Sequence, residues 1–173
     1  EGLAVAALDE TGQEKKGTST AGVKRQYMGC AGQVANGVNT VHCSYATRGG
    51  HALIGARLYL PAEQLDDPDR RTALGIPTDV VFRTKPQLAI DIITDALADQ
   101  TMPPWCAGDE VYGRSNQLRQ HLEDHQIGYV LRVGCAFTLE LNPATRLRVD
   151  ALAATHLTGE QHWQTVTVPG SKG

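Results

Sequence analysis

Apolar residues are grouped along the chain in short runs that predict strands first and helices later. The run over residues 3–8 predicts a buried strand that ends at Asp9, and the moderate alternation over 38–45 predicts a second strand. Residues 52–60 predict a third, and the Arg-Gly-Gly stretch at 48–50 favours a hairpin turn. The first part of the chain is therefore predicted to be an antiparallel meander.

Two stretches in this part have no clear period. Gly12 and the Lys-Lys-Gly stretch at 15–17 predict a turn, and residues 18–37 fit either short strands or a long loop. Residues 61–78 mix acidic and basic side chains with prolines, which predicts an exposed connection with one short helical turn.

Helix signals begin at Thr84. Thr84 is a suitable N-cap, and Pro86 lies early enough in the helix for its missing N–H to cost little. The apolar stripe that follows has helical spacing and ends before Pro103 and Pro104. The stripe consists of Leu88, Ile92, Ile93, Ala96 and Leu97.

A further strand, helix and strand follow. Residues 105–108 predict a buried strand, in which Trp105 is expected in the core or an interface. Ser115 is a suitable cap for a helix that carries Leu118 and Leu122 and stops at Gly128. Residues 129–133 predict the next strand.

The remaining residues predict more β structure, at 139–141, 146–149 and 164–168, with a short helix over 150–155. Antiparallel strands followed by alternating helices and strands indicate a mixed α/β sheet.

Composition narrows the class of protein. The 173 residues are 41% hydrophobic and suffice for one ordinary domain. A net charge of −3 argues mildly against nucleic-acid binding by charge alone. No apolar run is long enough to cross a membrane, and the start lacks a signal pattern. Four scattered cysteines indicate a reduced, cytoplasmic protein and disfavour zinc.

The candidate chemistry lies in a repeated arrangement of acidic residues. Asp9-Glu10 and Asp109-Glu110 both follow predicted apolar strands. If the two strands are neighbours, Asp9 and Asp109 converge and repel each other, and a divalent cation removes that penalty. Mg²⁺ prefers oxygen ligands, so the pattern indicates metal-dependent phosphodiester chemistry with Asp9 and Asp109 as ligands.

A structural interpretation of the same residues stays open. An aspartate after a strand is often only a turn former or a helix cap. Glu10 and Glu110 are expected to lie outside the set of direct ligands, as neighbours of the site or exposed to solvent.

Several ordered blocks resemble the core of insertion-sequence transposases of the IS701 type. These enzymes form a branch of the DDE superfamily close to the IS4-like enzymes, and the likeness covers nearly the whole chain. The blocks are DETG at 9–12, KKG at 15–17, GVKRQY at 22–27, GCAG at 29–32, RGGHALI at 48–54, LYLP at 58–61, TKPQLA at 84–89, GDEVYG at 108–113 and PGSKG at 169–173.

The resemblance implies an RNase H-like fold and DNA cleavage and joining that depend on Mg²⁺, or on Mn²⁺ as a substitute. It makes Asp9 the first catalytic acid and Asp109 the second. The family's third acid is a glutamate on a downstream helix, which we expect beyond Gly173. The segment 135–173 matches the start of a β-rich insertion.

The implied partners are insertion-sequence terminal repeats and target DNA, with a possible homodimer in a bacterial, nucleoid-associated setting. Basic residues of the matching blocks could contact DNA phosphates, or could form a solvated loop face. They are Lys15, Lys16, Lys24 and Arg25.

Two rival interpretations were weighed. Phosphatases of the haloacid dehalogenase type need a second aspartate two positions after the first, where this chain has Thr11. A truncated RNase H-like module that binds DNA or protein without catalysis is the stronger alternative.

Overall fold

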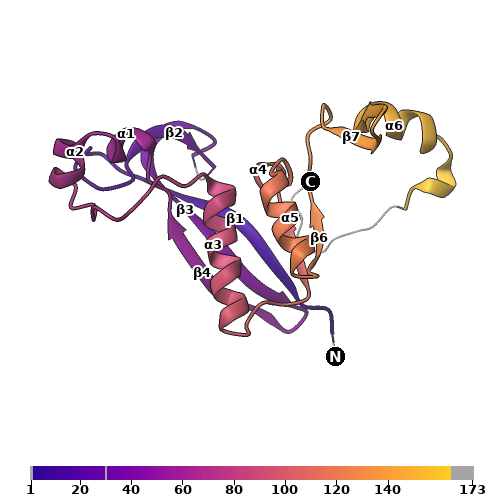
Figure 1. Cartoon of the computed structure of the whole chain (residues 1–173), viewed down its shortest axis with the longest axis horizontal. Coiled ribbons are helices and arrows are strands. Elements are labelled where there is room, and N and C mark those ends of the chain that lie inside the picture. Colours follow the sequence, from indigo (N-terminus) through magenta and orange to yellow (C-terminus); the bar gives the residue numbers. More distant parts are fainter. Residues whose placement is uncertain (1, 30, 165–173) are drawn as a thin grey trace. The chain divides into compact units, whose positions relative to one another are not determined.

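A computed structural model describes residues 2–29 and 31–164 of the chain, drawn in Figure 1. The chain divides into two compact units, Glu1–Arg132 and Val133–Gly173. No helix in the described ranges is both long and apolar enough to span a bilayer.

The first unit is built on a six-stranded mixed sheet. Its path runs β2-β3-β1-β5-β6, and β4 also pairs with β3. β3 is antiparallel to β1, β2 and β4, whereas β1–β5 and β5–β6 are parallel. The strands are β1 Val5–Glu14, β2 Lys24–Met28, β3 Gln33–Thr47, β4 Gly50–Leu58, β5 Trp105–Gly108 and β6 Gly128–Leu131. The predicted mixed α/β class, with antiparallel strands first, is confirmed.

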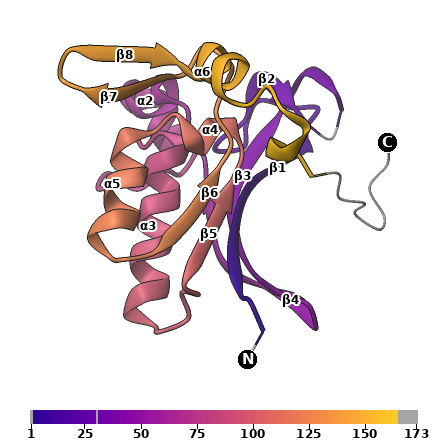
Figure 2. The ribbon, with the colours of Figure 1, turned by 90° about the vertical axis from the view of Figure 1, so that its right-hand side faces the viewer.

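Helices α3 and α5 lie side by side on one face of this sheet (Figure 2). The helices are α1 Ala62–Leu65, α2 Pro68–Ala73, α3 Lys85–Ala98, α4 Glu110–Gly113 and α5 Asn116–Asp124. The core lies between them and the sheet, because the apolar stripes of the helices and alternate residues of the strands are buried there. Its members include Ala6, Leu8, Val41, Cys43, Leu88, Ile92, Ile93, Cys106, Tyr112, Leu118 and Leu122.

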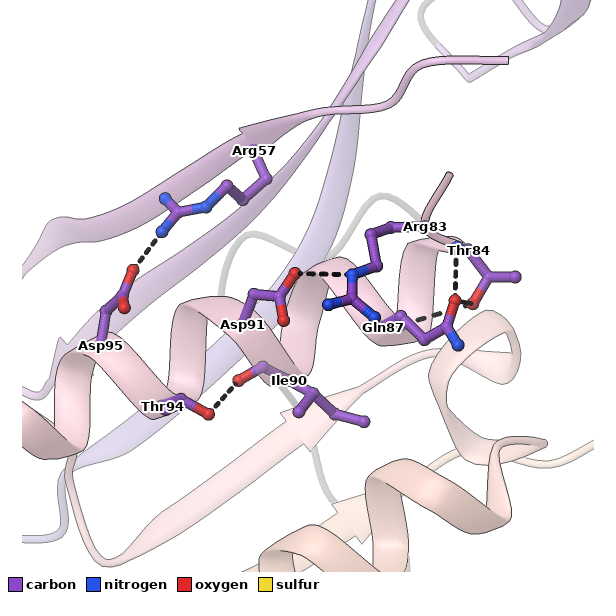
Figure 3. A network of polar contacts seen from close by, with 8 residues as sticks. All are labelled: Arg57, Arg83, Thr84, Gln87, Ile90, Asp91, Thr94 and Asp95. Carbon is purple, nitrogen blue, oxygen red and sulfur yellow. Dashed lines mark hydrogen bonds and ion pairs between the residues drawn. The ribbon is translucent and has the colours of Figure 1, made fainter. Parts of the chain in front are cut away.

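The start of α3 is fixed by local hydrogen bonds, as the sequence predicts. The Thr84 hydroxyl accepts from the backbone N–H of Gln87 at 3.4 Å, and the Thr84 N–H donates to the Gln87 side chain at 2.9 Å. Ion pairs of Arg83 with Asp91 and of Arg57 with Asp95 line the same helix (Figure 3). Since Arg57 belongs to β4, the second pair ties α3 to the sheet.

Three expectations about this unit are wrong. The first strand does not end at Asp9 but continues to Glu14, because β3 supplies backbone partners along its whole length. The connection 61–78 contains two short helices, and Gln64 is buried, where it bonds the backbone of Gly22 and Val23.

The role expected of Gly128 also differs, because this glycine does not end helix α5. Gln126, with φ 56°, makes the left-handed turn after α5, and Gly128 instead begins β6. A Cβ at Gly128 would lie 2.6 Å from the Trp105 ring, so this glycine is needed for close packing. Trp105 packs there while remaining 44% exposed, so of the two places expected for it the core is wrong and an interface stays a prediction.

The second unit contains a hairpin, a helix and one 3-10 turn in its described part. Strands β7 Thr138–Asn142 and β8 Thr145–Arg148 pair antiparallel, and α6 Val149–His156 and a turn over Glu160–His162 follow. The predicted hairpin strands and short helix are confirmed. The strand predicted over 164–168 lies outside the described residues, except for Gln164.

Gly55→Ala tests the packing of α3 on β4. A Cβ at position 55 would lie 2.3 Å from Cγ2 of Ile92, which is buried, so we expect the free energy of unfolding to fall by about 1–3 kcal/mol. Urea denaturation measures the change. Gly17→Ala is the control, because a Cβ at position 17 would have no atom within 4 Å apart from its chain neighbours. An equal effect of both substitutions would contradict the packing.

Thr84→Ala tests the start of α3. Loss of the capping hydroxyl should lower the free energy of unfolding by about 1 kcal/mol. Thr84→Ser keeps the hydroxyl and should lose much less. Thermal unfolding followed by circular dichroism compares the two variants, and equal losses would show that the cap contributes nothing.

Candidate metal centre

Three carboxylates lie close together at the C-terminal end of β5. Asp9 and Glu10 are neighbours on β1, and Asp109 directly follows β5. Because Leu8 pairs with Gly108 in the parallel register, the next residues of the two strands come together. One ligand oxygen from each of the three acids lies within 4.8 Å of the others. The structure thus brings Asp9 and Asp109 together, as the sequence analysis expected.

Local hydrogen bonds hold the two aspartates. Asp109 is the N-cap of α4, and its Oδ1 accepts from the N–H of Val111 at 2.9 Å. Asp9 Oδ1 accepts from the N–H of Glu10 at 2.8 Å. Asp109 therefore does act as a helix cap. A carboxylate has lone pairs for several partners, so capping leaves it able to bind a cation as well.

Glu10 lies on the helix-covered side of β1. Side chains alternate along a strand, and Glu10 continues the series of the buried residues Ala6 and Leu8. Its carboxylate is 2.7 Å from the Nζ of Lys85, the first residue of α3. The side chains of Glu10 and Lys85 are only 14% and 26% exposed. Glu10 is therefore part of the acidic cluster, whereas the sequence predicted it only as a neighbour of the site or as an exposed residue.

Glu110 is engaged elsewhere. It pairs with Arg114, one turn further along the chain. The hydrogen bond from Arg114 holds the pKa of Glu110 below its ordinary value. This carboxylate is not a member of the acidic cluster.

Tyr112 brings a buried hydroxyl close to the acids. The residue is fully buried, and its hydroxyl oxygen has no hydrogen-bond partner within the described part of the chain. Burial raises the pKa of the Tyr112 phenol, and the charges of Glu10, Asp109 and Asp9 raise it further. The phenol therefore stays protonated at neutral pH, so its O–H can donate a hydrogen bond to an oxygen near it.

The acids open into a cleft of about 630 Å³. A hollow of about 350 Å³ shares Gln26, Lys85 and Val111 with this cleft. Between β3 and β2, the buried Asn39 side chain donates to Gln26 at 3.0 Å, and Gln26 donates to the Gly37 carbonyl. The cleft is lined by Asp9, Glu10, Thr11, Gly12, Gln26, Tyr27, Gly29, Asn39, Lys85, Asp109 and Val111.

Of the predicted basic residues, Lys24 and Arg25 belong to β2, whereas Lys15 and Lys16 follow the end of β1. Lys24 lines the adjoining hollow and pairs with Glu63 at 2.7 Å. This hydrogen bond raises the pKa of Lys24 and lowers that of Glu63. Lys16 and Arg25 are exposed, and Lys15 is partly buried. None of the four residues lines the larger cleft itself.

The donor set fits a hard divalent cation. All three candidate ligands are carboxylates, which Mg²⁺ and Mn²⁺ accept, and the cleft leaves room for water and a phosphate. The buried thiols fit a metal poorly. Burial raises the pKa of Cys43 to about 11 and that of Cys106 to about 12, whereas a metal binds the thiolate.

Glu10 was predicted beside the site and not as a ligand, and neither Lys85 nor Tyr112 was predicted to belong to it. Period-two alternation carried past Asp9 would have placed Glu10 on the side of Leu8. The Lys85 pair joins segments distant in sequence, and no local pattern signals it.

Comparison with known proteins agrees with this geometry. Residues 1–172 match the family described as DDE superfamily endonuclease. A protein of Microchaete diplosiphon named "Probable transposase for insertion sequence element IS701" is 27% identical over 142 residues. The match covers 82% of this chain and 34% of that protein, so the chain spans about a third of its length. No solved structure matches. The chain belongs to the DDE superfamily endonuclease family.

Proposed function

We propose that this chain is part of the catalytic core of a DNA transposase, an enzyme that cleaves and joins DNA strands at insertion-sequence ends with Mg²⁺. The observation that carries the proposal is the meeting of Asp9 and Asp109 at the β1–β5 junction of a DDE family chain. The relative named a probable transposase supports the same conclusion.

The sheet supports an RNase H-like core. Three antiparallel strands, β4, β3 and β1, continue into the parallel strands β5 and β6, and α3 follows the antiparallel part. On this proposal, strand β2 is an addition between β1 and β3, the first two strands of that core. Residues 1–134 form the core, and 135–173 form the start of a β-rich insertion.

Asp9 and Asp109 are the proposed ligands of the cation and the catalytic acids. Bound Mg²⁺ supplies activation of the attacking water or 3′-hydroxyl and stabilisation of the leaving oxygen. The chain's own contribution is to hold the two carboxylates at fixed backbone positions and to offer a cleft beside them. Such positioning is a large part of phosphoryl-transfer catalysis.

DNA is the proposed partner, with contacts along the β2 side of the cleft. Lys15, Lys16, Lys24 and Arg25 offer positive charge to the phosphates there, which positions a strand without reading its sequence. A homodimer on paired ends is part of the same proposal. The alternative is an RNase H-like module that binds DNA without cutting it.

Asp9→Asn and Asp109→Asn test the proposal. Each removes one negative charge from the cluster, so we expect Mn²⁺ affinity to fall at least tenfold, and metal-dependent nicking of supercoiled plasmid to fall about a hundredfold or more. Isothermal titration with Mn²⁺ and gel analysis of the plasmid measure the two quantities.

Asp79→Asn is the matched control, because Asp79 is exposed and lies outside the cluster and the cleft. Nicking that survives in both cluster variants would contradict the assigned acids. Mn²⁺ binding that depends on Asp9 and Asp109, without nicking by this chain or by a longer form of it, would favour the DNA-binding module.

A further inference from the structure

The least exposed ion pair in the described part of the chain includes Glu10, a member of the candidate metal centre. Lys85 Nζ lies 2.7 Å from Glu10 Oε1, with side chains 26% and 14% exposed. Every other described pair has at least one side chain that is more than 40% exposed. A charge pair shielded from water interacts more strongly than a surface pair, so this contact matters for the charge balance of the cleft.

Both partners are held by the backbone. Glu10 lies within β1, opposite Val41 of β3. Lys85 is the first residue of α3 and lies inside the capping box that Thr84 and Gln87 form, and Pro86 restricts the backbone beside it. The ammonium therefore stands beside the acidic cluster because of the fold, and Lys85 also lines the cleft into which Asp9 and Asp109 open.

Tyr112 gives an independent indication that this side of the cluster takes a ligand. Its hydroxyl is buried and has no partner among the described residues, which is costly unless an oxygen atom accepts from it. Burial raises the pKa of this phenol, and the charges of Glu10, Asp109 and Asp9 raise it further. An oxygen in the coordination shell of a cation at the cluster, from Glu10 or from water, would be an acceptor for it.

We propose that Glu10 is a conditional third ligand of the cation and that Lys85 controls whether its carboxylate is free to bind. This inference rests on the proposed metal site of Asp9 and Asp109. In the metal-free chain, Lys85 neutralises Glu10 and limits the repulsion among the three acids. A cation at the cluster competes with Lys85 for the same carboxylate, so Lys85 lowers the metal affinity of the site.

A double-mutant cycle of Lys85→Met and Glu10→Gln, with Mn²⁺ affinity measured by isothermal titration, tests the proposal. Lys85→Met removes a positive charge next to a dication and frees Glu10, so Mn²⁺ should bind about tenfold more tightly. Glu10→Gln should cost about tenfold more affinity in the Lys85→Met background than in the wild-type background. This coupling is expected if Glu10 is a ligand of the cation and Lys85 competes for its carboxylate.

Lys24→Met is the matched control. It breaks a second lysine–glutamate pair with the same 2.7 Å contact, that of Lys24 with Glu63, which lies outside the acidic cluster. Its Mn²⁺ affinity should stay within about twofold of wild type, because screening weakens exposed charges at a distance. Lys85→Arg keeps the charge and should also bind Mn²⁺ like wild type.

Two results would overturn the proposal. Unchanged or weaker Mn²⁺ binding by Lys85→Met means that Lys85 serves only the start of α3. Additive effects of the two substitutions mean that Glu10 acts through space and is not a ligand. Failure of the underlying metal site is recognised separately. In that case the Asp109→Asn variant and the wild-type chain bind Mn²⁺ with the same affinity.

Discussion

The parallel pairing of β1 with β5 decides where the acidic side chains lie. β1 is the central strand, with antiparallel β3 on one edge and β5 on the other. β5 ends at Gly108, where a side chain would crowd Leu131 and Tyr112 at 3.2 Å, and the chain turns into α4. β1 continues to Glu14 against β3. The acids therefore gather at the one edge of β1 that β5 leaves open.

This position creates an electrostatic problem that the surrounding elements solve in part. Three carboxylates within 4.8 Å repel one another, and each negative charge is favoured by hydrogen bonds or by positive charge close by. The backbone N–H groups of Glu10 and Val111 serve the two aspartates, and Lys85 serves Glu10. Since helix α3 supplies Lys85, packing of that helix on the sheet is also part of the electrostatics of the site.

Sequence patterns were informative where the cause of the structure is local. Thr84 and Ser115 cap their helices as predicted, because capping depends on residues three positions apart. The sequence predicted that Asp9 and Asp109 converge if their strands are neighbours, and the parallel pairing of β1 with β5 meets that condition. The polar residues after Leu8 resemble a turn, and only pairing with β3 keeps them in a strand. Without that pairing the end of β1 could not be predicted. The contact of Glu10 with Lys85 depends on the packing of α3, which no local pattern indicates.

The two neighbouring acids of β1 then differ by face. Asp9 follows Val5 and Ala7 on the side away from the helices, whereas Glu10 follows Ala6 and Leu8 on the helix side. The protein can therefore offer its own cation to Glu10 but leaves Asp9 and Asp109 to be neutralised from the cleft. In the metal-free site the charges of Asp9 and Asp109 are not balanced by a cationic side chain of the described residues, which favours binding of a cation. The charge of Glu10 is balanced by Lys85, which limits the repulsion among the three acids. On the proposed function, the pairing of Glu10 with Lys85 reduces the repulsion among the clustered acids, so the chain can fold before it binds the metal.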